Sequence, residues 1–325
     1  MTEPSTTDAP PVRRNLATKP FSRADKIFYR STAIAAYFSV GLVVLILAFL
    51  LLRAWPTFET QGLAFIFGST WNASEAPVVL QIGPMIWGSL LIALVGLVIG
   101  VPMAIAIAYF IEFMASKVIA KIATVLLDLL AALPSIVIGL WGLVVFSPVA
   151  GHWAELLNSS LGFIPIFQNS SGNFLGSPFI AGWIVAVMIV PIIASVSREI
   201  FSQIDRDLIN GSLALGAGKA TTFFRVVLPT SGGGVVGGIL LGLGRALGET
   251  VAIFFVLNLA FDINWANIIE SKGGSVASLI LSKFGEATTE ELSGLMAAGL
   301  VLFIVTLIVN WVAALIVAKA QPWRQ

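Results

Sequence analysis

Long apolar runs alternate with polar stretches along this chain of 325 residues. Six runs are about as long as, or longer than, the roughly 20 residues that an α-helix needs to cross the hydrocarbon of a bilayer. Their bounds are 31–52, 82–111, 118–149, 178–196, 230–261 and 292–318. Hydrophobic residues make up 58% of the chain and charged residues only 11%, whereas soluble domains carry about 25% charged residues. The pattern therefore predicts an all-α integral membrane protein with six spans.

The polar ends set the predicted domain boundaries. We expect a polar N-terminal tail over 1–30, one transmembrane domain over 31–320 and a C-terminal tail over 321–325. The first apolar run is too long for a signal-peptide core and lacks a small-residue cleavage site. We therefore expect a retained span that ends at Arg53 and Pro56.

The segments between spans differ in length. Polar stretches are predicted at 54–80, 151–177 and 262–291, and Lys117 and Lys121 mark a short turn between the second and third spans. The third span contains Asp128 and the kink signal Leu133-Pro134-Ser135. Two connecting segments lie on the other side of the predicted spans, the 117–121 turn and the loop 197–229, and the loop is the longer of the two.

The distribution of basic residues predicts the orientation. Fourteen of the 18 Lys and Arg residues lie before the first span, in the 117–121 turn, in the 197–229 loop or after the last span at 318, whereas three, Arg53, Lys272 and Lys283, lie at the other ends of the spans. Because basic residues collect on the cytoplasmic side, we expect a multi-pass membrane protein with both termini and this loop in the cytoplasm. The formal net charge of +1 gives no indication of nucleic acid, and we expect none among the partners.

The loop 197–229 alternates apolar and charged residues and is interrupted at Gly216-Ala217-Gly218. This pattern predicts two short helices joined by a turn, lying on the membrane surface. One interpretation is a plain amphipathic interfacial helix. The other is a surface that grips a soluble partner.

The fifth span carries two ionisable residues, Arg245 and Glu249, followed by Thr250. Charges at membrane depth face a partner or a wet cavity, because they are costly in hydrocarbon. Their spacing of four predicts one helix face, so they form either a structural ion pair or part of a solute path. Arg offers planar donors that match a tetrahedral oxyanion. Asp128 is a second candidate, which either pairs with a cation, lies at headgroup level or serves the path.

Other residues favour packing rather than chemistry. We expect the glycines of the fifth span to pack helices closely through small-xxx-small pairs: Gly234/Gly238, Gly238/Gly242 and Gly244/Gly248. The chain has no Cys, and its one histidine, His152, has no second ligand at metal spacing, so no metal site is expected.

An ATP-binding P-loop is also absent. The sequence around Gly218-Lys219 has Leu213 and Ala220 where the motif needs Gly and Ser or Thr. If ATP is used, we expect another chain to bind it.

The loop resembles the coupling loop of ABC-importer permeases. In that family Glu-Ala-Ala is followed by three residues, Gly, nine residues, an aliphatic residue, one residue and Leu-Pro. Here Gly216 is followed by nine residues and then by Val226, Val227, Leu228 and Pro229. The first half departs, because Asn210, Gly211 and Ser212 stand where Glu-Ala-Ala is expected. Asp205 or Asp207 is the candidate for the acidic contact that this glutamate would make with the ATPase.

The segment Arg-Ala-Leu-Gly-Glu-Thr at 245–250 is similar to permeases of phosphate-specific ABC importers, of the PstC type. The paired PstA type usually continues Gly-Glu-Thr-Ala-Pro, whereas this chain has Glu249-Thr250-Val251-Ala252. Two further segments also resemble this family: Leu133-Pro134-Ser135-Ile136-Val137 with Gly139, and Gly274-Ser275-Val276-Ala277.

The resemblance implies a six-helix, type I permease that lies in the bacterial inner membrane and forms half of a phosphate pore. It implies a PstA-like second permease, a PstB-like ATPase dimer that uses ATP and Mg, and a PstS-like phosphate-binding protein. The chain itself would be a transport subunit that binds no cofactor and catalyses no reaction. The implied path residues are Arg245, Glu249 and Thr250, and the implied coupling residues are Asp205, Asp207, Asn210, Gly211, Ser212, Gly216, Leu228 and Pro229.

Three alternatives stay open from the residues alone. The first is an ABC permease for another oxyanion, such as sulfate, molybdate or phosphonate. The second is a secondary transporter driven by an ion gradient, which would show inverted repeats. The third, a membrane-embedded enzyme, needs a nucleophile with a base or a set of metal ligands, which a chain with one His and no Cys scarcely offers.

Overall fold

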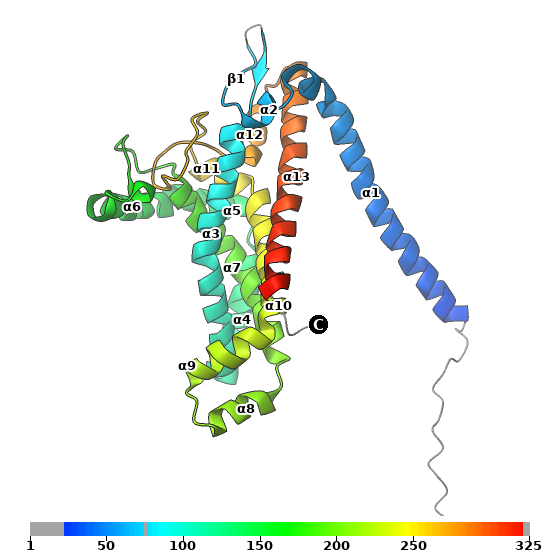
Figure 1. Cartoon of the computed structure of the whole chain (residues 1–325), viewed down its shortest axis with the longest axis vertical. Helices are drawn as coiled ribbons and strands as arrows, with labels where there is room; N and C mark the ends of the chain where they lie inside the picture. The colour runs from blue at the N-terminus through cyan, green and yellow to red at the C-terminus, as the bar shows by residue number, and fades with distance from the viewer. Residues whose placement is uncertain (1–22, 75–76, 321–325) are drawn as a thin grey trace, which may run out of the picture. The chain divides into compact units, whose positions relative to one another are not determined.

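The computed structural model describes residues 23–74 and 77–320, with side chains up to residue 316. It is built of helices, apart from a two-stranded antiparallel hairpin (Figure 1). Six helical segments in this part of the chain are long and apolar enough to cross a membrane. They are Arg23–Gln61, Gly83–Met114, Ser135–Leu161, Pro178–Ser202, Lys219–Gly248 and Thr289–Ile316. The predicted all-α membrane class and the number of spans are confirmed.

Helix α1, Arg23–Gln61, starts earlier and ends later than predicted. The contacts of the chain define two compact units, one up to Phe49 and one from Leu50 onward. In the first unit residues 23–30 are helical rather than tail, and residues 1–22 lie outside the described residues. In the second unit the helix continues through Pro56, although a proline inside a helix removes a backbone hydrogen bond and crowds the carbonyl four residues earlier. It ends at Gly62, whose φ of 56° is in the left-handed region.

Helix α7, Pro178–Ser202, forms the centre of the second unit. It packs against α3 (Gly83–Tyr109), α4 (Lys117–Ala132) and α10 (Leu228–Gly248). Glycines allow α3 and α7 to approach closely, because a Cβ on Gly96 would overlap Val185 and one on Gly182 would overlap Val95. Burial on nearly all sides explains why the sequence of α7 is almost continuously apolar.

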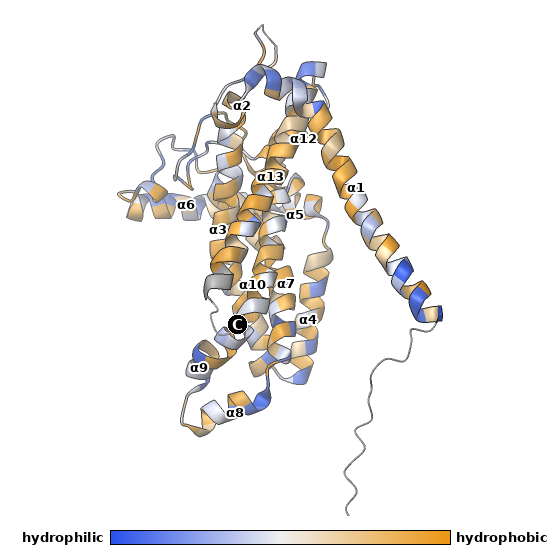
Figure 2. Ribbon diagram, turned by 45° about the vertical axis from the view of Figure 1, so that its right-hand side comes forward, coloured by the Kyte–Doolittle hydropathy of each residue, from blue (hydrophilic) through white to orange (hydrophobic). Residues whose placement is uncertain are grey.

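The third span is broken, which corrects the prediction of one span over 118–149. Helix α4 ends at Leu133-Pro134, and a second helix follows as α5 (Ser135–Trp141), the π-helical turn η2 (Gly142–Phe146) and α6 (Ser147–Leu161). The physical reason is the proline, which keeps the preceding residue out of the helical region; Leu133 has φ −63° and ψ 132°. In both views α6 lies across the direction of α3 (Figures 1 and 2).

Several segments predicted as polar connections are helical. Residues 151–161 belong to α6, and Lys117 and Lys121 lie in α4 rather than in a turn. Between the first two spans lie α2 (Ala64–Phe67) and the strands β1 (Trp71–Asn72) and β2 (Val79–Leu80). The register pairs Trp71 with Leu80 and Asn72 with Val79. The remaining short element of the 151–177 stretch is η3 (Pro165–Phe167).

The stretch 262–291 contains α12 (Val276–Lys283), which begins at a capping box formed by Ser275 and Ser278. The last helix, α13 (Thr289–Ala320), packs against α10 and α12. The polar stretch before the last span therefore folds into a capped helix, because its backbone groups still need hydrogen-bond partners.

The predicted fifth span, 230–261, is also interrupted. Helix α10 ends at Gly248, and α11 (Val251–Val256) follows after Glu249 and Thr250. On the other side α10 continues from α9 (Lys219–Thr222) through the π-helical turn η4 (Phe223–Val227). The span therefore begins earlier and ends earlier than its apolar pattern indicated.

Candidate functional site

Helix α10 carries a row of glycines that packs against α7. A Cβ on Gly234 would overlap Ile200, one on Gly238 would lie 3.1 Å from Val196, and one on Gly242 would overlap Ile193. These three positions are spaced by four residues and therefore share one helix face. The close-packing prediction is confirmed for Gly234/Gly238 and Gly238/Gly242.

A second row on α10 is open in the described chain. A Cβ on Gly237 or Gly248 would meet no atom within 4 Å, and Gly244 would meet only the Asn310 amide at 3.9 Å. The predicted Gly244/Gly248 pair thus makes no close helix contact within this chain. Leu241 and Arg245 are exposed along the same row. This row therefore presents the charged side chain of Arg245 beside glycines.

The end of α10 separates Arg245 from Glu249. Arg245 lies in the last helical turn, whereas Glu249 has left the helix, with φ −70° and ψ 125°. The prediction that a spacing of four places them on one helix face is therefore wrong, because the helix ends between them. The two side chains form no ion pair with each other in the described chain, so the structural-pair interpretation has no contact to support it.

Glu249 has a partner of another kind. Its side chain is 8% exposed, and its Oε1 accepts a hydrogen bond from the backbone N–H of Ala252 at 3.3 Å. Thr250 donates its hydroxyl to the Gly248 carbonyl at 3.2 Å. The carboxylate and hydroxyl therefore satisfy backbone groups that the break leaves without helical partners. The Arg245 guanidinium stays exposed with its donors free to meet an anion.

Asp128 lies on a different helix, α4, where it is exposed. Within residues 23–74 and 77–320 it has no hydrogen bond or ion pair to another side chain. The structure thus leaves Asp128 without the cation that one interpretation assigned to it.

The predicted coupling loop folds as two short helices joined by a turn, as expected. Helix α8 (Arg206–Ala214) and α9 are separated by Leu215–Gly218. Gly216 has φ 84°, a left-handed conformation that glycine adopts without steric cost. The loop is shorter than predicted, because α7 extends to Ser202 and α10 already begins at Leu228. Leu215 at the turn is 91% exposed, which leaves an apolar side chain uncovered at the tip.

The residues singled out in this loop have distinct local roles. Asp205 caps α8 by accepting a hydrogen bond from the Asp207 N–H at 2.9 Å. The hydroxyls of Ser212 and Thr222 lie 3.0 Å apart and join α8 to α9. Asp207, Asn210 and Gly211 are exposed. The segment that replaces Glu-Ala-Ala thus provides a link between the two helices and two open positions beside it.

Leu228 and Pro229 begin α10 rather than ending the loop. Leu228 is partly buried and packs against the apolar cluster of Phe201, Phe223 and Val227. Its assignment to the surface that a partner grips is therefore a poor fit to its burial. Pro229 is exposed near the start of α10, directly after the π-helical turn η4.

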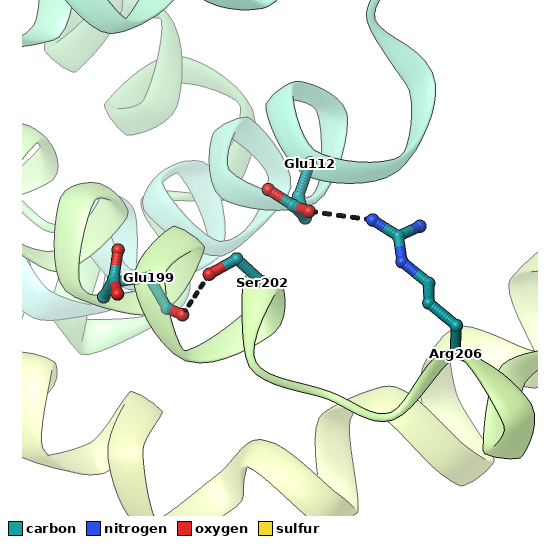
Figure 3. A network of polar contacts seen from close by, with 4 residues as sticks. All are labelled: Glu112, Glu199, Ser202 and Arg206. Carbon is teal, nitrogen blue, oxygen red and sulfur yellow. Dashed lines mark hydrogen bonds and ion pairs between the residues drawn. The ribbon is translucent and has the colours of Figure 1, made fainter.

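An ion pair and an aromatic cluster connect the loop to the membrane helices. Arg206 Nη2 donates to Glu112 Oε1 at 3.2 Å, and the guanidinium lies 5.7 Å from the Phe113 ring (Figure 3). Glu112 and Phe113 belong to the π-helical turn η1 (Phe110–Met114) that ends α3. Beside this pair, Ser202 donates to the Glu199 carbonyl at 2.7 Å and so closes the end of α7 (Figure 3).

The aromatic cluster gives this connection its apolar part. The ring of Phe223 lies 4.4 Å from that of Tyr109 and 6.1 Å from that of Phe201. It therefore ties η4 to both α3 and α7. Sequence reasoning missed these residues and Glu112; the available signal was a single acid at the end of the second span, facing a loop that carries Arg206.

The opposite end of the unit contains a buried carboxylate, Glu270, in the segment before α12. It is 3% exposed, and its Oε2 accepts bonds from the Ser170 N–H at 2.6 Å and the Ser170 hydroxyl at 3.2 Å. Burial by itself raises the pKa of Glu270, but the hydrogen bonds from Ser170 and Ser171 and the charge of Lys272 outweigh it. The pKa is therefore below its ordinary value. This contact joins the two long polar segments, 162–177 and 257–275.

Comparisons with known proteins give three consistent matches. Residues 96–321 match the family described as binding-protein-dependent transport system inner membrane component. The chain is 35% identical over 303 residues to the phosphate transport system permease protein PstC of Pasteurella multocida, covering 91% of this chain and 92% of that relative. It is 34% identical over 296 residues to the phosphate transport system permease protein PstC 2 of Mycobacterium tuberculosis, covering 90% and 91%.

Among solved structures, a chain of a bacterial alginate ABC transporter, crystallised with an alginate pentasaccharide-bound periplasmic protein, matches with a TM-score of 0.56. The identity is 17%, and the match covers 93% of this chain and 99% of that chain. At this identity the match shows the fold alone.

Proposed function

The chain belongs to the family of binding-protein-dependent transport system inner membrane components, and we propose that it is the PstC-type permease subunit of an ATP-driven phosphate importer. It has the six-helix fold of type I ABC-importer permeases. The observation that carries the choice of phosphate is the 35% identity to a phosphate permease over 91% of the chain. The fold alone would fit many cargoes.

In this proposal the chain supplies half of the pore and works with three kinds of partner. A PstA-like permease forms the other half, a PstB-like ATPase dimer binds ATP and Mg, and a PstS-like protein delivers phosphate. The termini and the α8–α9 loop lie in the cytoplasm, as the Lys and Arg distribution favours. The chain binds no cofactor of its own and is not an enzyme.

Coupling to the ATPase would run through the α8–α9 loop. An ATPase that holds α8 moves Arg206, and with it Glu112 at the end of α3. The exposed ion pair alone contributes about 0–1 kcal/mol. The rings of Tyr109, Phe201 and Phe223 add apolar contact that keeps the loop and the helix ends moving together.

The substrate path would include Arg245, Glu249 and Thr250. The Arg245 guanidinium offers fork-shaped donors to the oxygens of a phosphate at membrane depth. Glu249 keeps the break open by capping Ala252 and does not neutralise the cation. An anion can therefore meet Arg245 without first displacing an internal carboxylate.

Reconstitution tests the proposal. The chain is purified with its second permease and ATPase, placed in proteoliposomes and given a phosphate-loaded binding protein. We expect ATP-dependent phosphate uptake that needs all components. Phosphate uptake without the ATPase would contradict the proposal and favour a secondary transporter. Sulfate, molybdate and phosphonate are added as competitors; if one of them is transported in preference to phosphate, the cargo assignment is wrong although the importer assignment stands.

A further inference from the structure

Helix α4 has three distinct faces, of which one packs against the apolar core in the described part of the chain. Ala120, Ala123 and Leu127 lie on the face that contacts the core around α7. A second face is apolar and open, with Ile122, Leu126 and Leu129 between 54% and 60% exposed. The third face is polar and consists of Lys117, Lys121, Thr124 and Asp128. Spacings of four, three and four residues place these four side chains in one row.

A cation from α7 lies against this polar row. Arg198 Nη1 donates to the Thr124 hydroxyl at 2.6 Å, and that hydroxyl donates in turn to the Ala120 carbonyl at 2.8 Å. Arg198 has no carboxylate partner in the described part of the chain, and neither do Lys117 and Lys121. Three cations and one carboxylate thus share this side of α4 without internal neutralisation.

The depth of the row decides what can cover it. Asp128 lies eleven residues beyond Lys117, which is about 16 Å along a helix. With the Lys117 end of α4 at the cytoplasmic headgroups, as in the proposed orientation, the lysine side chains extend to those headgroups, but the short Asp128 side chain, about 16 Å further along the helix, does not reach them. Because a charge in hydrocarbon is costly, the polar face needs water or protein, whereas the Ile122 face suits lipid. Hydrophilic residues along α4 are visible in Figure 2.

We propose that the polar face of α4, together with Arg198, lines the water-filled cytoplasmic half of the path and receives the oxyanion after Arg245. The inference rests on the proposed function, because it takes its cargo and orientation from it. Water fits better than a dry interface with the second permease, since a dry interface would bury three cations with one acid. An excess of cations with mobile side chains offers successive weak contacts to a departing anion.

The absence of cysteine from the chain gives a clean test. Single cysteines replace residues in two consecutive pairs, Lys121→Cys with Ile122→Cys and Asp128→Cys with Leu129→Cys. Each pair holds depth constant and changes only the face. The assembled complex in inside-out vesicles is treated with a membrane-impermeant thiol reagent, and the labelling rate is measured. A thiol reacts as its thiolate, which needs water, so we expect at least tenfold faster labelling at 121 and 128 than at 122 and 129.

Equal, slow labelling within both pairs would overturn the proposal. So would labelling at 121 and 128 that appears only after the second permease is removed, because the face would then be a subunit interface. The labelling rate does not depend on which anion is carried. A face-specific pattern combined with failed phosphate uptake would therefore refute the proposed cargo and keep the wet face. A uniform pattern combined with normal uptake would refute the wet face alone.

Discussion

Two rows of residues run along α10, and they differ in what covers them. Gly234, Gly238 and Gly242 face α7 closely enough that a Cβ at each would crowd Ile200, Val196 or Ile193. The row of Gly237, Leu241, Arg245 and Gly248 has no such neighbour in the described chain. The sequence presents both rows as glycine-rich. Only the contacts separate a row that holds the chain together from a row that is free to meet substrate or a second subunit.

The largest effect is expected from filling the packed row. We predict that Gly238→Leu prevents a stable complex, because even a Cβ there lies 3.1 Å from Val196 and overpacking costs about 1–3 kcal/mol or more. The matched control is the neighbouring Gly237→Leu, at a position with nothing within 4 Å. Thermal unfolding and the yield of detergent-purified complex measure the difference. Equal loss in both variants would show that the open row is packed as tightly in the assembly.

The second effect concerns the charge on the open row. We predict that Arg245→Ala leaves assembly intact and lowers ATP-dependent phosphate uptake about tenfold or more, the size expected for losing a hydrogen bond to a charged group. Leu241→Ala, one turn earlier on the same row, is the control and should retain most uptake. Uptake is measured in proteoliposomes, and assembly by size-exclusion chromatography. If Arg245→Ala fails to assemble, the open row serves subunit packing instead of the path.

The smallest effect is expected from a buried acid away from α10, Glu270. Glu270 is buried, accepts hydrogen bonds from Ser170 and has a lowered pKa. A lowered folded-state pKa contributes stability that is present above the ordinary value of 4.5 and is lost as the pH falls through the folded-state value. We therefore expect the melting temperature of the complex to fall below pH 4.5, and to fall less in Glu270→Gln. The same acid dependence in both proteins would assign it to other carboxylates.

The two breaks in the spans show which features can be predicted from local sequence and which cannot. The break at Leu133-Pro134 has a local cause, since proline restricts the residue before it, and the kink was predicted there. The break at Glu249-Thr250 contains no proline. A continuous helix with Arg245 and Glu249 on one face was expected there instead. Glu249 leaves the helix and bonds to the Ala252 N–H. Such a cap depends on the packing of α11 against α5 and α7, which the local sequence does not contain.

In the loop between α7 and α10, too, some features were predicted from the sequence and others were not. Its two helices and the turn at Gly216 were predicted, because amphipathic spacing and glycine act locally. The ion pair of Arg206 with Glu112 joins residues 94 positions apart, so no local pattern could indicate it. For Leu228 the motif position suggested a partner surface, whereas in the described chain its side chain is partly buried against the cluster of Phe223 and Phe201.

The sequence by itself determined the membrane class, the six spans, the side that collects basic residues and the family. These follow from hydrophobic length, charge distribution and short motifs, which are properties of neighbouring residues. Only the tertiary structure decided which glycines of α10 are packed, that Arg245 and Glu249 are not joined, and that Arg198 lies beside the polar face of α4. Each of these depends on contact between helices distant in sequence, where side-chain volume and unsatisfied polar groups choose one arrangement.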